Sequence, residues 1–223
     1  MKSILIISLL LSTYCFSQKT YSFDYLVRYE FTIHKDSIEK TVVRQYLTNS
    51  KKNNYVAVVT DLDSLNYQMD FKDENGLTFN VNFLKSDLNN AETINVDCRY
   101  VKQYLSNHKD LIKNHKYLNM NDTLLEKETL NRYKLISTKD RKRKPAEVLF
   151  IIENNTDFHL PILYNPLNFQ EWKSEKSIPN GIFKERLVYD HQKNIKVHEK
   201  LVGYHKIDKK IIIDLECDYT TDK

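Results

Sequence analysis

Pairs of carboxylates are the first residues in this chain whose type and spacing could support chemistry. Two acidic side chains on either side of a scissile bond can act as general acid and nucleophile in a glycosidase or a related hydrolase. The closely spaced candidates are Asp61 and Asp63, Asp70 and Asp73, Glu171 and Glu175, and the run Asp214, Glu216 and Asp218. Alternate positions on a strand share one face, so this spacing is equally typical of the solvent-facing side of a strand. No pair stands out, and the sequence assigns no catalytic residue.

Seven histidines offer possible metal ligands, and the last three recur every seven residues. They are His34, His108, His115, His159, His191, His198 and His205. On a helix the recurring three would share one face. The sequence predicts strands and a turn there, and an odd interval on a strand places neighbours on opposite faces. The pattern favours exposed or structural histidines over a metal site.

Motifs for phosphate and nucleotide chemistry are missing from the sequence. The three glycines are too few for a phosphate-cradling loop, and neither a GxSxG nor an HExxH motif occurs. No cofactor and no metal are therefore predicted. The 34 basic and 30 acidic residues are mixed along the chain, which disfavours binding to nucleic acid. The cationic run at 139–145 is predicted to be a solvated hairpin loop, with contact to phosphate or an anionic surface as the alternative.

Residues 1–17 have the layout of a secretory signal peptide. An apolar run follows the positive Lys2, and the small Ser17 occupies a plausible cleavage position. The run is too short to span a bilayer as a permanent helix. The mature chain, 18–223, is therefore predicted to be exported to the periplasm or the extracellular space without a transmembrane segment. A lipoprotein acylated on Cys15 is the alternative, which the bulky residue before that cysteine disfavours.

Removal of the leader leaves two cysteines, Cys98 and Cys217, each at the end of a strand-like segment. An exported protein meets an oxidising compartment, where an even number of cysteines permits pairing. The sequence predicts a disulfide between Cys98 and Cys217, with two separate buried thiols as the alternative. Neither cysteine belongs to a CxxC motif, which disfavours reactive-cysteine chemistry.

The elements that would position these side chains are mostly strands. From Tyr21 to Ile33 apolar and polar residues alternate, which predicts one long strand with a single buried face. Residues 65–71 and 77–83 alternate around Asn75-Gly76, whose tolerance of positive φ predicts a tight hairpin. Further strands are expected at residues 38–47, 55–59, 132–137, 148–153, 158–163, 182–189, 195–204 and 210–217. Residues 100–118 fit a short helix or an irregular connection.

One helix is predicted after Asn165, which is an N-cap candidate followed by Pro166 at the first helical position. Phe169 and Trp172 then share one face, and the helix should end near Lys176. Strands recur about every ten residues without a linker or a break in composition. They predict one mainly β (α+β) domain, a large curved antiparallel sheet or half-barrel with one or two helices packed on it. One face of that sheet should be buried and the other wet.

Aromatic residues are the remaining feature, with fifteen Tyr and ten Phe. Most fall on the buried side of the expected strands, where they usually form the core. A curved sheet with an aromatic inner face can also hold an apolar ligand. The residues of this candidate face are Phe23, Tyr25, Tyr29, Phe31, Tyr67, Phe79, Phe169 and Trp172.

The layout of the chain resembles that of secreted proteins of unknown function from Bacteroidetes. It begins with the leader and the long strand YSFDYLVRYEFTI, and the later run EWKSEKSIPNGIFKERLVYD precedes a strand. Trp172, Ile178-Pro179 and Gly181 in that run are weakly similar to the GLPGLI family, although the namesake motif is replaced here by 178–182. The resemblance implies an exported β-rich protein and supplies no catalytic residues.

Three functions stay open at this point. A binding module for an apolar ligand or a lipidated partner would need a concave aromatic face that the helix leaves partly open. A structural or protein-interaction component of the cell envelope would show an exposed apolar patch or an open strand edge. A secreted hydrolase would need paired carboxylates in a cleft, one of them with a raised pKa.

Overall fold

The computed structural model describes most of the chain from residue 18 to residue 214. The described ranges are 18–35, 38–104, 115–119, 123–125, 128–137, 147–175 and 178–214. The leader at 1–17, the basic run at 139–145 and Cys217 lie outside them, so the predictions made for these segments remain predictions.

Thirteen strands form one sheet. In the first half of the chain the elements are β1 (Gln18–Lys35), β2 (Ile38–Asn49), β3 (Lys52–Asp61), β4 (Asn66–Asp73), β5 (Leu77–Leu84), α2 (Lys85–Asn90), β6 (Thr93–Val96), the 3₁₀ turn η1 (Cys98–Tyr100) and β7 (Val101–Gln103). In the second half they are β8 (His115–Asn119), β9 (Thr123–Leu125), β10 (Glu128–Ser137), β11 (Glu147–Ile152), α4 (Pro166–Glu175), β12 (Phe183–Tyr189) and β13 (Ile195–Asp214).

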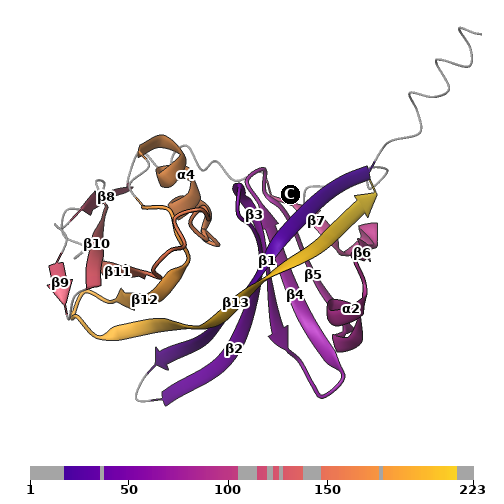
Figure 1. Cartoon of the computed structure of the whole chain (residues 1–223), viewed down its shortest axis with the longest axis horizontal. Helices are drawn as coiled ribbons and strands as arrows, with labels where there is room; N and C mark the ends of the chain where they lie inside the picture. The colour runs from indigo at the N-terminus through magenta and orange to yellow at the C-terminus, as the bar shows by residue number, and fades with distance from the viewer. Residues whose placement is uncertain are drawn as a thin grey trace, which may run out of the picture.

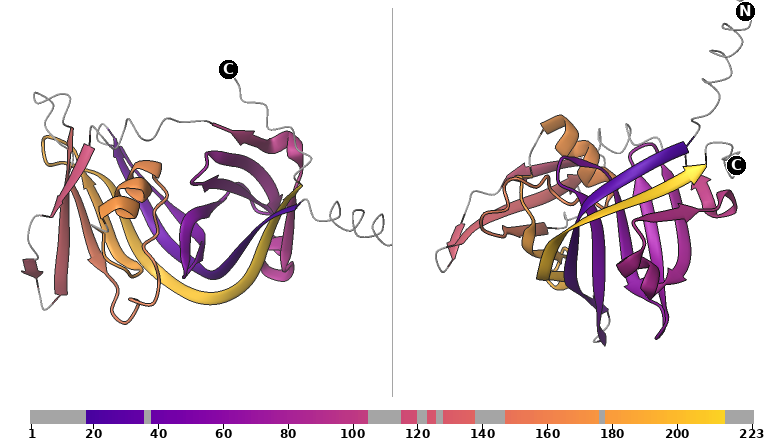
Figure 2. Two further views of the ribbon diagram at one scale, coloured as in Figure 1. Left: turned by 90° about the horizontal axis from the view of Figure 1, so that it is seen from above. Right: turned by 45° about the vertical axis from the view of Figure 1, so that its right-hand side comes forward.

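The strands follow the order β7-β5-β4-β3-β2-β1-β13-β12-β11-β10-β8, and all neighbours along this path are antiparallel. Strand β9 pairs with β10, and β6 pairs in parallel with the last residues of β13. The long strands β1 and β13 form the middle of the sheet, which curls away on both sides of them (Figure 1). Seen from above, the sheet is an open U (Figure 2). The predicted curved antiparallel sheet is confirmed.

The sheet has a hydrophobic core on the side of α2. Phe23, Phe71, Phe79, Leu88 and Ile211 are among its buried residues. We call it the α2-side core. It brings the first part of β1 and the last part of β13 against β3, β4 and β5.

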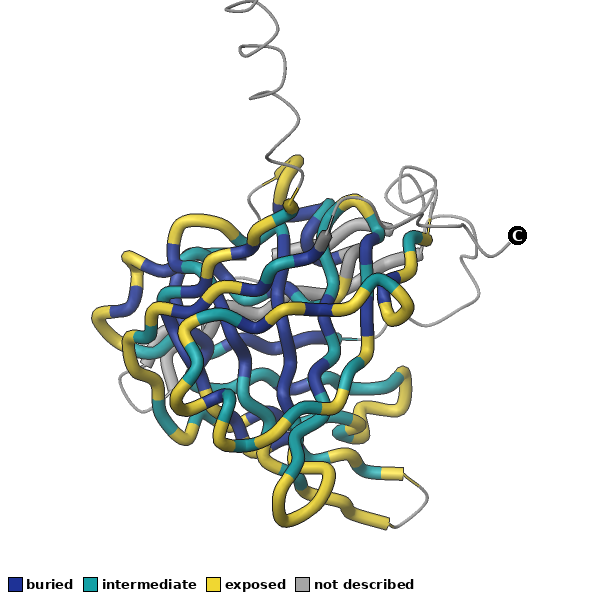
Figure 3. Tube along the Cα trace, turned by 90° about the vertical axis from the view of Figure 1, so that its right-hand side faces the viewer, coloured by how far each residue is buried: buried dark blue, intermediate teal, exposed yellow. Residues whose placement is uncertain are grey.

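A second core lies beneath α4 and is called here the α4-side core. It includes Tyr25, Tyr29, Phe150, Phe169 and Trp172. Burial is concentrated in the middle of the strands, whereas turns and strand ends are exposed (Figure 3). Each buried aromatic side chain stabilises the fold by about 2 kcal/mol.

Strand β3 contributes to both cores, which corrects the expectation of one wet sheet face. Five consecutive residues of this strand, 55–59, are all buried. Tyr55, Ala57 and Val59 belong to the α2-side core, and Val56 and Val58 to the α4-side core. A strand covered on both faces loses the alternation of apolar and polar residues.

The predicted helix and hairpin are both present. Helix α4 begins at Pro166, as expected, and buries Phe169 and Trp172. Strands β4 and β5 pair as a hairpin in which the Gly76 amide donates to the Asp73 carbonyl. Gly76 has a φ of +82°, and among the described residues Asn75 does not share a positive φ, so only one of the two turn residues takes the predicted conformation.

Three predicted segments differ in the structure. Residues 158–163 form no strand, because their backbone bonds individually to the β2–β3 turn, as where the Leu160 amide donates to the Ser50 carbonyl. The strands expected at 195–204 and 210–217 are one strand, β13, and the turn expected between them is a bulge opposite Phe23 and Tyr25. Helix α2 was not predicted. Residues 100–118 were expected to form a short helix or an irregular connection, and the described part of this range contains the strands β7 and β8.

No helix among the described ranges has both the length and the apolar character needed to cross a membrane.

Candidate functional site

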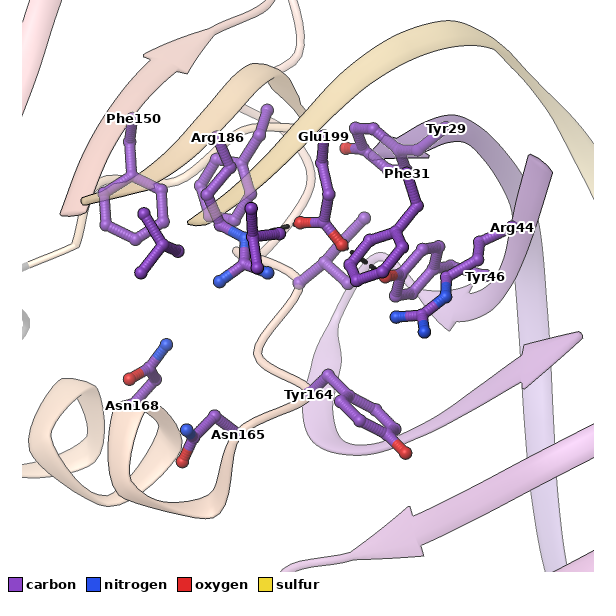
Figure 4. Close-up of a pocket in the computed structure, with 14 residues that line it drawn as sticks. Tyr29, Phe31, Arg44, Tyr46, Phe150, Tyr164, Asn165, Asn168, Arg186 and Glu199 are labelled. Carbon is purple, nitrogen blue, oxygen red and sulfur yellow. Dashed lines mark hydrogen bonds and ion pairs between the residues drawn. The ribbon is translucent and has the colours of Figure 1, made fainter. Parts of the chain in front are cut away.

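A cavity of about 240 Å³ lies between the concave side of the sheet and the segment that leads into α4. Its walls combine aromatic, aliphatic and charged side chains from six parts of the chain (Figure 4). They are Tyr29, Phe31, Arg44, Tyr46, Phe150, Ile162, Tyr164, Asn165, Asn168, Phe183, Arg186, Val188, Val197 and Glu199.

Glu199 is the centre of the polar part of the cavity. Its side chain is 8% exposed, and it lies directly across from Arg186 in the β12–β13 register. The Nε of Arg186 forms an ion pair with one carboxylate oxygen at 2.5 Å. The hydroxyl of Tyr46 donates to the other oxygen at 2.6 Å. Both oxygens of this buried acid are therefore engaged.

These contacts determine the protonation of the group. Burial by itself would raise the pKa of Glu199, but the charge of Arg186 and the hydrogen bonds from Arg186 and Tyr46 hold that pKa below its ordinary value of 4.5. Burial and the neighbouring Glu199 charge raise the pKa of Tyr46 far above 10. At neutral pH the acid is ionised and the phenol keeps its proton, so neither is poised for acid–base exchange.

Arg44 and Tyr29 face each other across β1 and β2 at the other side of the cavity. The guanidinium carbon of Arg44 lies 3.4 Å from the centre of the Phe31 ring, which is a close cation–π contact. The buried Nε of Arg44 and the buried hydroxyl of Tyr29 have no hydrogen-bond partner among the described residues. The backbone of Phe183 lies near Tyr29 without meeting hydrogen-bond geometry.

The opposite wall comes from the segment before α4 and from the first turn of that helix. Figure 4 shows the side chains of Tyr164, Asn165 and Asn168 on this wall, across from Arg186 and Glu199. Surface contacts fasten the wall to β4 and its turn. The Nζ of Lys72 lies 4.5 Å from the centre of the Tyr164 ring, and Lys173 pairs with Glu74 at 2.7 Å.

The structure distributes the predicted aromatic face over two places. Tyr29 and Phe31 line the cavity, and Tyr25, Phe169 and Trp172 are buried in the α4-side core without lining it. Phe23 and Phe79 belong to the α2-side core, and Tyr67 packs against that core. Tyr67 also borders a second groove, of about 670 Å³, lined by polar and apolar residues from β1, β2, β3, α2, β13 and the residues between α2 and β6.

Sequence reasoning missed the charged part of the cavity, formed by Arg44, Arg186 and Glu199. A pattern for it exists in the sequence. Arg44 has the parity of the buried Tyr46 in β2, and Glu199 has the parity of Val197 in β13, so both occupy inward-facing positions. Charged residues at such positions are rarely buried unless they are paired.

The candidate carboxylates are spread over separate structural contacts. Asp63 accepts the Leu65 amide of its own turn at 2.8 Å, Asp70 accepts from Asn80 at 2.5 Å, and Asp73 pairs with Lys19 at 2.9 Å. Asp61 pairs with Lys85. Glu171 is buried in α4. Glu216 and Asp218 lie outside the described residues.

The candidate metal ligands do not converge either. In the part of the chain that the structure describes, no group of three His, Cys, Asp or Glu residues is placed to hold a metal ion. His159 is buried and structural: its Nδ1 lies 2.5 Å from the Leu160 carbonyl and its Nε2 lies 3.0 Å from the Thr48 hydroxyl. His108 lies outside the described residues.

Comparisons with known proteins give distant structural likenesses. No protein-family model and no curated protein matches the chain, so the resemblance to the GLPGLI family stays a prediction. The MucA/MucB complex of Pseudomonas aeruginosa contains a chain that is 5% identical, with a TM-score of 0.41; the match covers 82% of this chain and 51% of that one. This chain therefore spans about half the length of that protein. A DUF1329 family protein from Desulfovibrio piger is 8% identical, with a TM-score of 0.35 and 92% of both chains covered. A LolA superfamily protein from Nitrosomonas europaea is 11% identical, with a TM-score of 0.32 and coverages of 84% and 86%.

Proposed function

We propose that this protein is an exported, non-catalytic binding module of the cell envelope. It holds an apolar ligand, or the apolar part of a lipidated partner, in the cavity between the sheet and α4. The observation that carries the proposal is the cavity itself, which α4 covers without filling and which Phe31, Phe150, Phe183 and Tyr164 line. Concave, largely apolar sites with a few polar groups are typical of ligand-binding proteins.

The size of the cavity limits what it accepts. Its volume of about 240 Å³ lies just below the roughly 300–1,000 Å³ of sites for drug-sized molecules. A small molecule fits, and so does a single chain or side chain of a larger partner.

The layout of the leader supports export, because residues 1–17 match a signal peptide.

The chemistry of the cavity supports binding over catalysis. Among the described residues that line it, Glu199 is the only carboxylate. Arg186 and Tyr46 bind both of its oxygens and its pKa is lowered, whereas a general acid needs a raised pKa.

Trp172 provides the test, because it is the only tryptophan of the chain and sits on α4. Its fluorescence is followed during titration with 1-octanol, octanoate and 3-phenylpropanoate. We expect a saturable change with at least one of these probes. Val188→Phe, which fills the cavity from β12, should abolish the change. Val202→Phe, at a position on β13 that is 51% exposed, is the matched control and should preserve it.

Two results would overturn the proposal. One is the absence of a saturable response to all three probes. The other is a response that Val188→Phe leaves intact, because the ligand would then bind elsewhere. Native mass spectrometry of protein purified from an exporting cell complements the titration, since a co-purifying mass reports the size of the natural ligand and the mass of the chain reports cleavage and acylation.

An exposed apolar patch supports a second candidate, a protein-interaction component of the envelope. Leu62, Leu65 and Leu84 are 48%, 68% and 50% exposed, and all three surround Asn66 at the end of the β3–β4 turn. Such patches often mark interaction sites. Crosslinking in the native envelope tests this candidate. A partner that is captured by the wild-type protein and lost in Leu65→Lys supports the role. Identical crosslinks from both proteins exclude the patch as the interaction site.

A further inference from the structure

We infer that the cavity recognises a small carboxylate, whose charged group is bound by the edge of the Arg44 guanidinium and by the Tyr29 hydroxyl. The inference rests on the proposed binding function and deepens it, because it specifies the polar end of the ligand. It is carried by two buried polar atoms of the cavity that have no partner.

The charges around the cavity do not balance. Among the lining residues, Arg44 and Arg186 are cationic and Glu199 is the single acid. Glu199 is already held by Arg186 and Tyr46. Arg44 forms no ion pair with any residue in the described ranges. One positive charge is left over, and an anionic ligand would neutralise it.

The geometry of Arg44 suits a planar anion. Phe31 covers one face of the guanidinium at 3.4 Å, so the cation is stabilised from its face and its hydrogen-bond donors remain at its edge. Its Nε is buried without an acceptor, which costs free energy in the unliganded protein. The donors of a guanidinium edge match the two oxygens of a carboxylate, and such pairs are both strong and directional.

Tyr29 offers the second donor. Its side chain is 3% exposed, lines the cavity and lies opposite Arg44 in the β1–β2 register. Burial, with the nearby charge of Glu199, raises its pKa well above 10, so the hydroxyl keeps its proton and donates. A ligand oxygen that accepts from Tyr29 would satisfy the other unpartnered atom of the site.

The remaining walls define the body of the ligand. Ile162, Phe183, Val188 and Val197 present apolar surface. Together with a volume of about 240 Å³, this selects a carboxylate with a short aliphatic or a single aromatic body. The first turn of α4 contributes Asn165 and Asn168 to the opposite wall, and the positive end of a helix dipole also favours an anion.

A comparison of octanoate with 1-octanol tests the inference, because the two differ in the charged end. We expect wild type to bind octanoate about tenfold or more tighter than 1-octanol, as charge-assisted hydrogen bonds predict. Arg44→Gln should remove this preference by weakening octanoate far more than 1-octanol. Arg44→Lys, which keeps the charge but loses the planar edge, should retain part of it, and Tyr29→Phe should weaken octanoate selectively.

Arg28→Gln is the matched control. Arg28 lies one residue before Tyr29 on β1, points to the opposite face and borders the second groove instead of the cavity. It should bind octanoate as wild type does, although it loses the same charge. Thermal unfolding of every variant checks that the fold is retained.

The outcomes separate this inference from the function on which it rests. If 1-octanol binds as tightly as octanoate, or if Arg44→Gln weakens both equally, recognition of the anion is wrong and the apolar binding site stands. If none of the three probes gives a response that Val188→Phe abolishes, the binding function itself is wrong, and the inference is wrong with it.

Discussion

The hydroxyl of Tyr46 donates a 2.6 Å hydrogen bond to Glu199, although 153 residues separate the two in the sequence. Tyr46 is on β2 and Glu199 on β13, and β1 lies between these strands in the sheet. Arg186 extends the contact to β12. One buried polar cluster therefore links residues of three strands across a span of four adjacent strands, and it forms the floor of the cavity.

This cluster is expected to be sensitive to the loss of its acid. Glu199→Gln should lower the free energy of unfolding by about 3 kcal/mol, because it removes the carboxylate charge that pairs with the partly buried Arg186 and accepts from Tyr46. Urea denaturation at neutral pH measures the loss. Glu185→Gln is the control, since Glu185 is more exposed and pairs with His198 near the surface at 3.0 Å. The control should cost less than about 1 kcal/mol, and equal losses in the two variants would contradict a special role for Glu199.

His159 should make the stability of the fold depend on pH. Burial is the main cause that lowers its pKa below 6.5, although the Leu160 carbonyl and Asp24 oppose the shift. The unfolded chain then binds the proton more readily than the folded one, so stability is present above pH 6.5 and is lost as pH falls below it.

Denaturation at several values between about pH 7 and pH 5 tests this expectation. Wild type should lose stability over that range, and His159→Gln should be less stable at neutral pH but nearly independent of pH within it. The titration of Glu199 falls lower, below its ordinary pKa of 4.5, and does not overlap. A pH dependence that persists unchanged in His159→Gln would assign the effect to another group.

Gly181 is expected to tolerate no side chain. Its φ is +131°, a region that other residues rarely adopt, and a Cβ there would overlap with the Cγ2 of Ile152. Gly181→Ala should therefore lower the free energy of unfolding by about 1–3 kcal/mol. Gly203→Ala is the control because a Cβ at Gly203 meets no atom within 4 Å, and it should be neutral or slightly stabilising. Thermal or urea unfolding of both variants decides the matter.

The disulfide between Cys98 and Cys217 remains a prediction, and the sheet supports it. Val96 pairs in parallel with Ile213, so β6 and β13 end at the same edge of the sheet. Cys98 follows β6 by two residues, and Cys217 follows β13 by three. Peptide mass mapping without reductant should find the linked pair, and Cys98→Ser should lower stability by about 2–4 kcal/mol. A free thiol on Cys98 in protein from an oxidising compartment would refute the bridge.

The fold could be predicted from the sequence where a strand has solvent on one side. Apolar and polar residues alternate in strands β1, β4 and β5, and the start of α4 is encoded locally by Pro166. The positions of these elements could therefore be predicted. Strand β3 could not show alternation because two cores cover it. The sequence Ile207-Asp208-Lys209 predicted a turn, but β13 pairs with β1 along most of its length and accommodates this stretch as a bulge.

The cavity was only half predictable. Tyr29 and Phe31 follow from the alternation of β1, because one strand determines the face on which its aromatic side chains lie. Arg44, Arg186 and Glu199 meet only through the order of four strands and their registers, and no segment of sequence encodes that order. Their charges also resemble those of ordinary solvent-facing residues until their partners are known.

The pairing of β1 with β13 has a consequence for how the chain reaches this structure. Strand β1 pairs with β13 along most of its length. Synthesis therefore produces β1 long before β13, which is one of its two neighbours in the sheet. Contacts this distant in sequence slow folding, because a large loop must close before they form. Nascent chains that stop before Ile195 should show no protection against hydrogen exchange for the amides of residues 18–23, which pair with β13 and not with β2, and chains that include β13 should show it. The first part of β1 therefore stays unpaired until β13 has been synthesised.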